Sequence, residues 1–174
     1  MQITSIKDLP PQDRSRQHAR VLRLLFEHGG KQAMSEDYLQ LARASDSCWK
    51  KPDVSLLLAT VRGEDGPALI GASFMAGYGK DAFLIAIHPL YRRKGIGSAL
   101  LRRQLEELGK IEIHANLSQT ALLNLLLKAG LSVSFLGKNP AGRKFLSLNE
   151  ETKNPVRPPR APTKEGEILC LFLS

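Results

Sequence analysis

Residues 85–98 read Ile-Ala-Ile-His-Pro-Leu-Tyr-Arg-Arg-Lys-Gly-Ile-Gly-Ser and pass from an apolar run through a basic turn into a leucine-rich stretch. The run 81–88 is short and apolar and ends at Pro89, which is typical of a buried strand. Apolar residues then recur at helical spacing from Gly95 to Leu108, and Gly109 ends the pattern. The sequence therefore predicts a strand, a tight turn and an amphipathic helix in direct succession.

The turn between this strand and this helix has the composition of a phosphate-binding turn. The first turn of a helix leaves backbone N–H groups unpaired, and the aligned peptide dipoles make that end partly positive. Two glycines let the backbone approach an anion closely, a serine adds a hydroxyl group, and three basic side chains supply charge. The residues predicted to bind phosphates are Arg92, Arg93, Lys94, Gly95, Ile96, Gly97 and Ser98.

Two other phosphate loops do not fit this turn. The sequence contains no G-x-x-x-x-G-K-[ST] pattern, and a dinucleotide fingerprint needs a third glycine beyond Gly97. Taken alone, the R-x-x-G-x-G pattern of residues 92–97 also describes an ordinary helix start with a solvated basic rim. The strand before it and the helix after it favour the phosphate-binding interpretation.

The N-terminal part of the chain predicts two helices and three antiparallel strands. Helical spacing of apolar residues indicates the first helix, and a serine followed by two carboxylates indicates the start of the second. A Gly-Glu-Asp-Gly-Pro turn joins the first two strands as a hairpin. The predicted elements are helices at 11–28 and 35–45 and strands at 55–62, 68–76 and 81–88.

The remainder of the chain predicts a strand at 110–115, a helix at 118–129 and strands at 131–136 and 168–173. A helical crossover makes strand 110–115 parallel to strand 81–88. Leucines surround helix 118–129, so it is either deeply buried or part of a dimer interface. The sequence does not decide whether the protein forms a homodimer. Residues 138–166 hold five of the ten prolines and seven Lys or Arg against three Glu. They are expected to form a basic loop, in which a short strand at 144–148 is left open.

The composition fits a single domain that spans residues 1–174. The chain is 43% hydrophobic, and no apolar run reaches the roughly 18 residues that a membrane helix needs. Residues 1–20 lack the apolar core of a secretory signal, so a cytoplasmic location is the default expectation. Cys48 and Cys170 lie outside any metal-spaced cluster with the histidines, so both are expected to be reduced and no metal is predicted.

The formal net charge of +8 gives the chain a positive field that attracts polyanions. A nucleotide cofactor, a nucleic acid and an acidic partner all satisfy this condition. Aromatic residues make up only 6% of the chain, and Phe145 is the one aromatic residue in the basic loop, which disfavours stacking on nucleic acid bases. The charge also slightly favours an acidic or phosphorylated substrate over a polycation, because like charges repel on approach.

The succession of strand, proline, aromatic residue, R-x-x-G-x-G and leucine-rich helix over residues 84–108 resembles the signature of the GNAT superfamily of N-acetyltransferases. Residues 111–131 look like that family's next strand and helix, and Lys128-Ala129-Gly130-Leu131 resembles its K-x-G-F ending. The order and the spacing of the two stretches agree with the family.

The resemblance implies an α/β fold with a central, mixed but mostly antiparallel sheet of about six to seven strands and helices on both faces. It implies that the strands ending near Ile87 and beginning near Ile111 splay apart. The pantetheine arm of acetyl-CoA would insert between them and bond to backbone groups of Ala86 and Ile87. The implied activity is transfer of the acetyl group by direct attack of a primary amine, carried by a small molecule or a peptide. No covalent enzyme intermediate and no metal are needed.

The implied reaction needs a base, because an alkyl amine with a pKa of ~10.4 is mostly protonated at neutral pH. Asp81 is the first candidate, since some family members, notably protein lysine acetyltransferases, carry a carboxylate at this distance before the signature. A solvated aspartate at a strand end is the alternative. His88 and His114 also lie at strand ends, and histidine titrates near neutral pH. A packed or solvent-facing ring is the alternative for both, and His114 is preferred because it would lie where the pantetheine channel meets the substrate.

The sequence departs from the family at the residue that protonates the leaving thiolate. Counting back from Gly130, Gln119 and Leu126 stand where the family commonly has an asparagine and a tyrosine. Tyr78, Tyr91, Ser118 or solvent would have to act instead. Coenzyme binding is therefore better supported than turnover. An acyl-CoA-binding regulator without catalysis is a second hypothesis, and nucleic-acid binding through residues 138–164 is a third.

Overall fold

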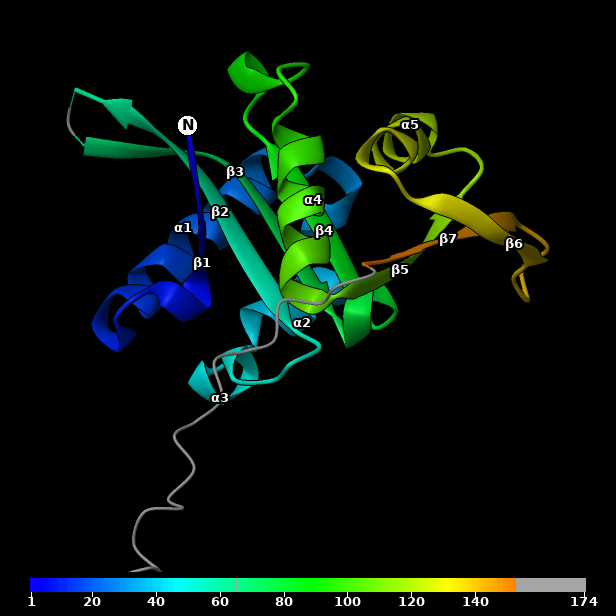
Figure 1. The fold of residues 1–174 in the computed structure, drawn as a ribbon, viewed down its shortest axis with the longest axis horizontal. Helices are drawn as coiled ribbons and strands as arrows, with labels where there is room; N and C mark the ends of the chain where they lie inside the picture. Colours follow the sequence, from blue (N-terminus) through cyan, green and yellow to red (C-terminus); the bar gives the residue numbers. More distant parts are fainter. Residues whose placement is uncertain (65, 153–174) are drawn as a thin grey trace, which may run out of the picture.

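Within residues 1–64 and 66–152, which the computed structural model describes, the strands form two antiparallel sheets (Figure 1). The first sheet has the order β1-β2-β3-β4. Its strands are β1 (Gln2–Ser5), β2 (Ser55–Gly63), β3 (Gly66–Ala76) and β4 (Ala82–Ile87). Strands β2 and β3 are the predicted hairpin, with Ser55 opposite Met75 and Gly63 opposite Gly66. Strand β1 was not predicted, because four residues are too few to establish a period-two pattern.

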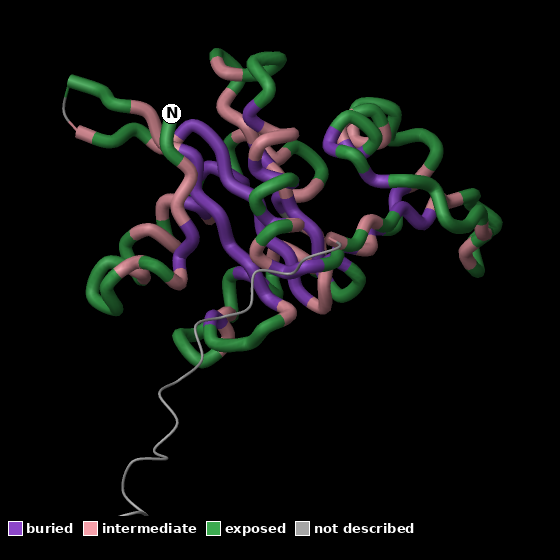
Figure 2. Tube along the Cα trace, viewed as in Figure 1, coloured by how far each residue is buried: buried purple, intermediate pink, exposed green. Residues whose placement is uncertain are grey.

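Helices cover both faces of this first sheet. Helix α1 (Pro11–His28) and helix α2 (Glu36–Ala42) lie on one face, and α4 (Ile96–Leu108) lies on the other. The alternation of side chains along a strand explains the two cores. Leu56 packs with the α1 and α2 residues, whereas its neighbour Leu57 packs with Ile96 and Leu100 of α4. Figure 2 shows the buried residues running along these central strands.

The second sheet has the order β5-β7-β6 and lies beside the first (Figure 1). Its strands are β5 (Lys110–Asn116), β6 (Ser132–Lys138) and β7 (Lys144–Glu151). Helix α5 (Thr120–Ala129) packs on one face of this sheet and against α4. Leu126 of α5 is fully buried while Leu127 is 49% exposed, so the leucine-rich helix is buried on one side only.

Short helical segments complete the described chain. They are η1 (Ile6–Asp8), η2 (Gly30–Met34), α3 (Asp46–Trp49), η3 (Gly77–Gly79) and η4 (Pro89–Tyr91). The predicted second helix ends at Ala42 rather than near Ser45, and α3 follows it as a separate turn. Its predicted serine cap is confirmed, because Ser35 Oγ accepts the N–H of Tyr38.

The expected loop at 138–166 is wrong over part of its length. Strand β7 runs through residues 144–151 and is the central strand of the second sheet, so the short strand that was left open exists and extends further. Charged residues hid it, because β7 is buried at Ser147 and Leu148 but exposed toward both ends. The rest of the loop beyond residue 152, the predicted strand at 168–173 and Cys170 lie outside the described residues.

Candidate functional site

A cleft of about 870 Å³ lies between β4 and α5. Strand β4 supplies Ile85, Ala86 and Ile87 to its lining, the glycine turn supplies residues between Tyr91 and Ser98, and α5 supplies its first turns. Strands β4 and β5 belong to different sheets and do not pair with each other. The predicted splay of these two strands is therefore present, and it opens toward the glycine turn.

The glycine turn has the geometry of an anion-binding helix start. Gly95 adopts φ 78°, a left-handed conformation that favours glycine, and it is the N-cap of α4. The first intrahelical bond joins the N–H of Ala99 to the carbonyl of Gly95 at 3.0 Å. The N–H groups of Ile96, Gly97 and Ser98 precede it and have no intrahelical acceptor, so they remain available to an anion in the cleft.

Gly97 also lets α4 approach α5. A Cβ atom at this position would lie 2.9 Å from Leu125 Cδ1, which is closer than side-chain atoms approach one another. Leu125 itself lines the cleft beside the turn. The glycine pattern thus serves two purposes, namely access of a ligand to the backbone and close packing of two helices.

The three basic residues of the turn have different roles in the fold. Arg92 is held in place, because its Nε donates to the carbonyl of Ile87 at 3.1 Å and its Nη2 donates to the carbonyl of His28 at 3.3 Å. Lys94 lies over the ring of Tyr91, with Nζ 5.0 Å from the ring centroid. Arg93 is exposed and lines the cleft. A phosphate in this cleft would therefore meet the guanidinium group of Arg93 directly.

Strand β4 has a free edge that faces away from β3. The N–H of His88 donates to the carbonyl of Ile70 at 2.8 Å, and hydrogen-bonded residues alternate along an antiparallel pair. The backbone groups of Ala86 therefore point to β3, whereas those of Ile85 and Ile87 point to the free edge. The edge predicted to bond the pantetheine arm thus belongs to Ile87 and Ile85, and Ala86 contributes only to the lining.

Two side chains that sequence reasoning missed already bond this edge. Gln32 Oε1 in η2 accepts the N–H of Ile85 at 3.3 Å, and Asp37 Oδ2 in α2 accepts the N–H of Phe83 at 3.1 Å. Each bond joins residues about fifty positions apart. Asp37 carried a signal only as a carboxylate at a helix start, and Gln32 carried none.

The residues predicted to act as bases do not line the cleft. Asp81 is exposed, contacts Gly77 and lies at the opposite end of β4 from the glycine turn, roughly 20 Å away by the rise of six strand residues. His114 is on the open face of β5, with its Nε2 3.7 Å from Glu112 Oε1 and its ring 5.2 Å from that of Phe145. His88 is at the end of β4, where its Nδ1 accepts the N–H of Leu90 at 3.4 Å.

Some of the residues considered for the acid line the cleft and others do not. Leu126 is fully buried in the core between α5 and β5, so it does not reach the cleft. Gln119 lines the cleft, and its Oε1 accepts the N–H of Asn116 at 2.9 Å. Of the substitutes considered, Tyr91 and Ser118 line the cleft whereas Tyr78 does not.

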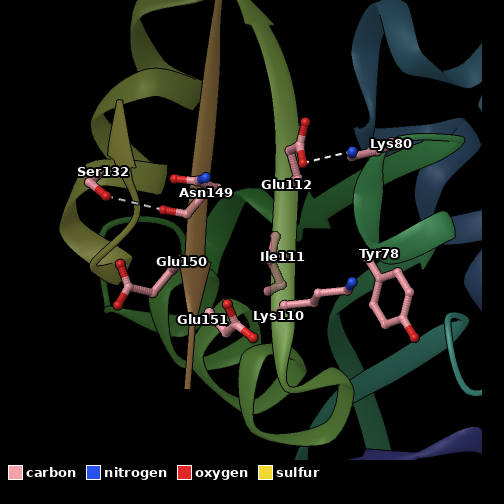
Figure 3. Close-up of a pocket in the computed structure, with 9 residues that line it drawn as sticks. All are labelled: Tyr78, Lys80, Lys110, Ile111, Glu112, Ser132, Asn149, Glu150 and Glu151. Carbon is pink, nitrogen blue, oxygen red and sulfur yellow. Dashed lines mark hydrogen bonds and ion pairs between the residues drawn. The ribbon is translucent and has the colours of Figure 1, made fainter. Parts of the chain in front are cut away.

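A second cavity of about 420 Å³ lies between η3 and the second sheet (Figure 3). Figure 3 shows one ion pair in it, with Lys80 Nζ 2.8 Å from Glu112 Oε2. The Nζ atom of Lys110 lies 4.6 Å from the ring centroid of Tyr78. The hydrogen bond from Lys80 holds the pKa of Glu112 below its ordinary value. Since no helix start with a glycine turn lines this cavity, the larger cleft is the candidate site.

Two further observations concern the described residues as a whole. None of their helices combines the length and the hydropathy that spanning a bilayer requires. They also contain no cluster of three or more His, Cys, Asp or Glu side chains arranged to hold a metal ion.

Comparison with known proteins gives a likeness in structure only. No protein-family model and no curated protein sequence matches this chain significantly. Solved structures do match. A GNAT-family acetyltransferase from Streptococcus pneumoniae is 16% identical, with a TM-score of 0.57 over 87% of this chain and 99% of that one.

Two other solved structures are similar to the same degree. A mutant of the spermidine N-acetyltransferase from Vibrio cholerae is 15% identical, with a TM-score of 0.58 over 90% of this chain and 96% of that one. An acetyltransferase from Bacillus subtilis in complex with CoA is 15% identical, with a TM-score of 0.52 over 87% and 98%. The order of elements, the separation of β4 from β5 and these similarities agree, and the chain therefore has the fold of the GNAT acetyltransferases.

Proposed function

We propose that this protein is an N-acetyltransferase that transfers the acetyl group of acetyl-CoA to a primary amine by direct attack. The observation that carries the proposal is that a helix start with free N–H groups and the free edge of β4 line the same cleft. Free N–H groups at a helix start bind a pyrophosphate, and the free edge of a strand binds an extended chain that carries amide groups. Acetyl-CoA has both parts in the order in which the cleft presents them.

The residues of the cleft fit this ligand. The N–H groups of Ile96, Gly97 and Ser98 and the guanidinium group of Arg93 bind the pyrophosphate. The arm then runs along β4 from Ile87 toward Ile85 and bonds to edge groups that Arg92 and Gln32 leave free. Because these backbone groups are already fixed in the sheet, binding does not carry the additional cost of ordering them.

Acetyl-CoA supplies an activated acyl carbon. The amine nitrogen forms the new C–N bond with its lone pair, the C–S bond breaks, and the thiolate leaves with the electron pair and takes a proton. The hydroxyl-bearing residues that line the cleft are Tyr91, Ser98, Ser118 and Thr120. Ser118, two residues before α5, is the proposed proton donor, with solvent as the other source. Asp81 and His114 remain the proposed bases, and His114 with Glu112 beside it acts from the open face of β5.

The proposal is tested by isothermal titration of acetyl-CoA into wild type, Arg93→Glu and Arg62→Glu. Both variants reverse one exposed arginine, but only Arg93 lines the cleft. A charge-assisted hydrogen bond contributes about 1.5–3 kcal/mol, so Arg93→Glu should weaken binding by roughly tenfold or more. Arg62→Glu is the matched control and should bind as wild type does. Equal affinity of all three proteins, or no saturable binding by folded wild type, would contradict the proposal.

A coenzyme-binding regulator without catalysis is the second candidate function. It is favoured by the burial of Leu126 and by the positions of Asp81 and His114 outside the cleft. Release of free CoA thiol in the presence of a panel of primary amines separates the two functions. Tight acetyl-CoA binding with no amine-dependent release would support the regulator.

A further inference from the structure

Gln32 places a side-chain amide where the coenzyme cleft meets the free edge of β4. It is half-buried in η2, it lines the cleft, and its Oε1 accepts the N–H of Ile85 at 3.3 Å. Its backbone is fixed on both sides. Its N–H donates to the carbonyl of Gly29 at 3.2 Å, and its carbonyl accepts Ser35 Oγ–H at 2.8 Å. The side chain is therefore presented from an anchored segment.

The orientation of this amide follows from its partner. The backbone of Ile85 offers a donor, so the atom facing it must be the oxygen of Gln32. The amide nitrogen then points away from Ile85 with two hydrogens to donate. An amide that accepts a hydrogen bond on its oxygen is polarised toward stronger donation from its nitrogen. The N–H of Ile85 is occupied by Gln32, but the amide nitrogen of Gln32 offers a ligand another hydrogen-bond donor at the same place.

The position of Gln32 along β4 determines which part of the coenzyme it meets. Arg92 occupies the carbonyl of Ile87, the edge group nearest the turn. The N–H of Ile87 and the carbonyl of Ile85 come next and can serve the amides of the pantetheine arm. Gln32 follows at the N–H of Ile85, about 7 Å along the strand from Ile87. The thioester carbonyl is the last acceptor of the arm, so it meets the Gln32 amide, since Asp37 already occupies the N–H of Phe83 further along the edge.

We propose that Gln32 donates a hydrogen bond from its side-chain nitrogen to the thioester carbonyl of bound acetyl-CoA. The same bond strengthens as negative charge develops on that oxygen during attack, so Gln32 is a catalytic residue of the oxyanion-stabilising kind. This inference rests on the proposed function, because it requires acetyl-CoA to occupy the cleft. It gives a chemical role to the segment between α1 and α2, which lines the cleft together with β4, the glycine turn and α5.

The test compares acetyl-CoA with free CoA, which has the same pyrophosphate and arm but no thioester carbonyl. Both dissociation constants are measured by isothermal titration for wild type and Gln32→Glu, and their ratio is taken. Glutamate keeps an oxygen acceptor for the N–H of Ile85 but removes the donor. Repulsion between the new charge and the phosphates affects both ligands and cancels in the ratio. The variant should lose acetyl-CoA affinity relative to CoA by about three- to tenfold, the size of one neutral hydrogen bond.

Two further variants make the result decisive. Gln40→Glu adds the same charge on the exposed side of α2 and should leave the ratio at its wild-type value. Gln32→Met removes both the acceptor and the donor and frees the N–H of Ile85, so under the proposal it does not favour acetyl-CoA more than wild type does. If Gln32 merely blocks that N–H, the methionine variant will instead bind acetyl-CoA selectively tighter.

The outcomes separate this inference from the proposed function. An unchanged ratio in Gln32→Glu, or a ratio shifted toward acetyl-CoA in Gln32→Met, overturns the role of Gln32 and leaves the coenzyme site intact. Wild type that binds neither ligand overturns both. Thermal unfolding of each variant verifies that it is folded, and the ratio is read only from folded variants.

Discussion

Gln104 is a fully buried polar residue on α4, the helix whose first turn forms the candidate phosphate site. Its Oε1 accepts Ser73 Oγ–H at 2.7 Å, and its Nε2 donates to the carbonyl of Ser73 at 3.2 Å. The pair fixes α4 against β3 at a point where the neighbouring contacts are apolar. Each hydrogen bond of this kind contributes about 0.5–1.5 kcal/mol net. Gln104→Leu, which keeps the volume but loses both bonds, should therefore lower the free energy of unfolding by about 1–3 kcal/mol.

The double variant distinguishes the pair from simple packing. Ser73→Ala alone leaves the amide oxygen of Gln104 buried without its partner, which costs about 1–3 kcal/mol. Replacing both side chains by apolar groups leaves neither side chain unpaired, so Ser73→Ala with Gln104→Leu should cost less than the sum of the two single variants by about 0.5–3 kcal/mol. Urea unfolding of the four proteins measures this difference, provided that the slopes agree. Single costs that simply add would refute the assignment of a coupled hydrogen-bonded pair.

Two other predictions concern the buried Leu126 and the half-buried His18. Leu126→Tyr places a larger side chain at a fully buried position, so overpacking should lower the free energy of unfolding by about 1–3 kcal/mol. Because the position does not reach the cleft, the variant should not release CoA faster in the presence of amines. Faster release from an equally stable variant would contradict the geometry. Burial lowers the pKa of His18, whose Nε2 lies 2.8 Å from the carbonyl of Leu41, so the unfolded chain takes up this proton more readily than the folded chain. The free energy of unfolding should then fall as the pH drops from about 6.5 toward the folded pKa. The fall should be smaller in His18→Gln than in wild type. If urea unfolding of the two proteins depends on pH in the same way, this reasoning is wrong.

Much of the fold could be read from local patterns. The spacing of apolar residues predicts α1, α4 and α5, and the Gly-Glu-Asp-Gly-Pro turn predicts the β2–β3 hairpin. The glycines that cap α4 at both ends adopt the left-handed conformations for which glycine is suited. These signals are reliable because they depend on neighbours a few residues apart.

Strand β7 and the two candidate bases were harder to place. Residues 144–151 carry charges and follow a turn, so their composition resembles a loop, yet pairing on both sides by β5 and β6 makes them the centre of a sheet. The distance before the signature points to Asp81, and the strand end near the expected splay points to His114, but position along a strand does not determine which face or end of the cleft a side chain reaches. Only the pairing of the strands decides that.

The sequence by itself determined the glycine turn, the helix that follows it and the fold to which they belong, because backbone conformation and amphipathic periodicity are local properties. The tertiary structure alone decided what lies on the free edge of β4. Gln32 and Asp37 bond to backbone groups 53 and 46 residues away, and no pattern in the sequence marks such a partner. The physical reason is that a β-edge offers the same N–H group whatever its side chains are, so its occupant is selected by the packing of distant segments.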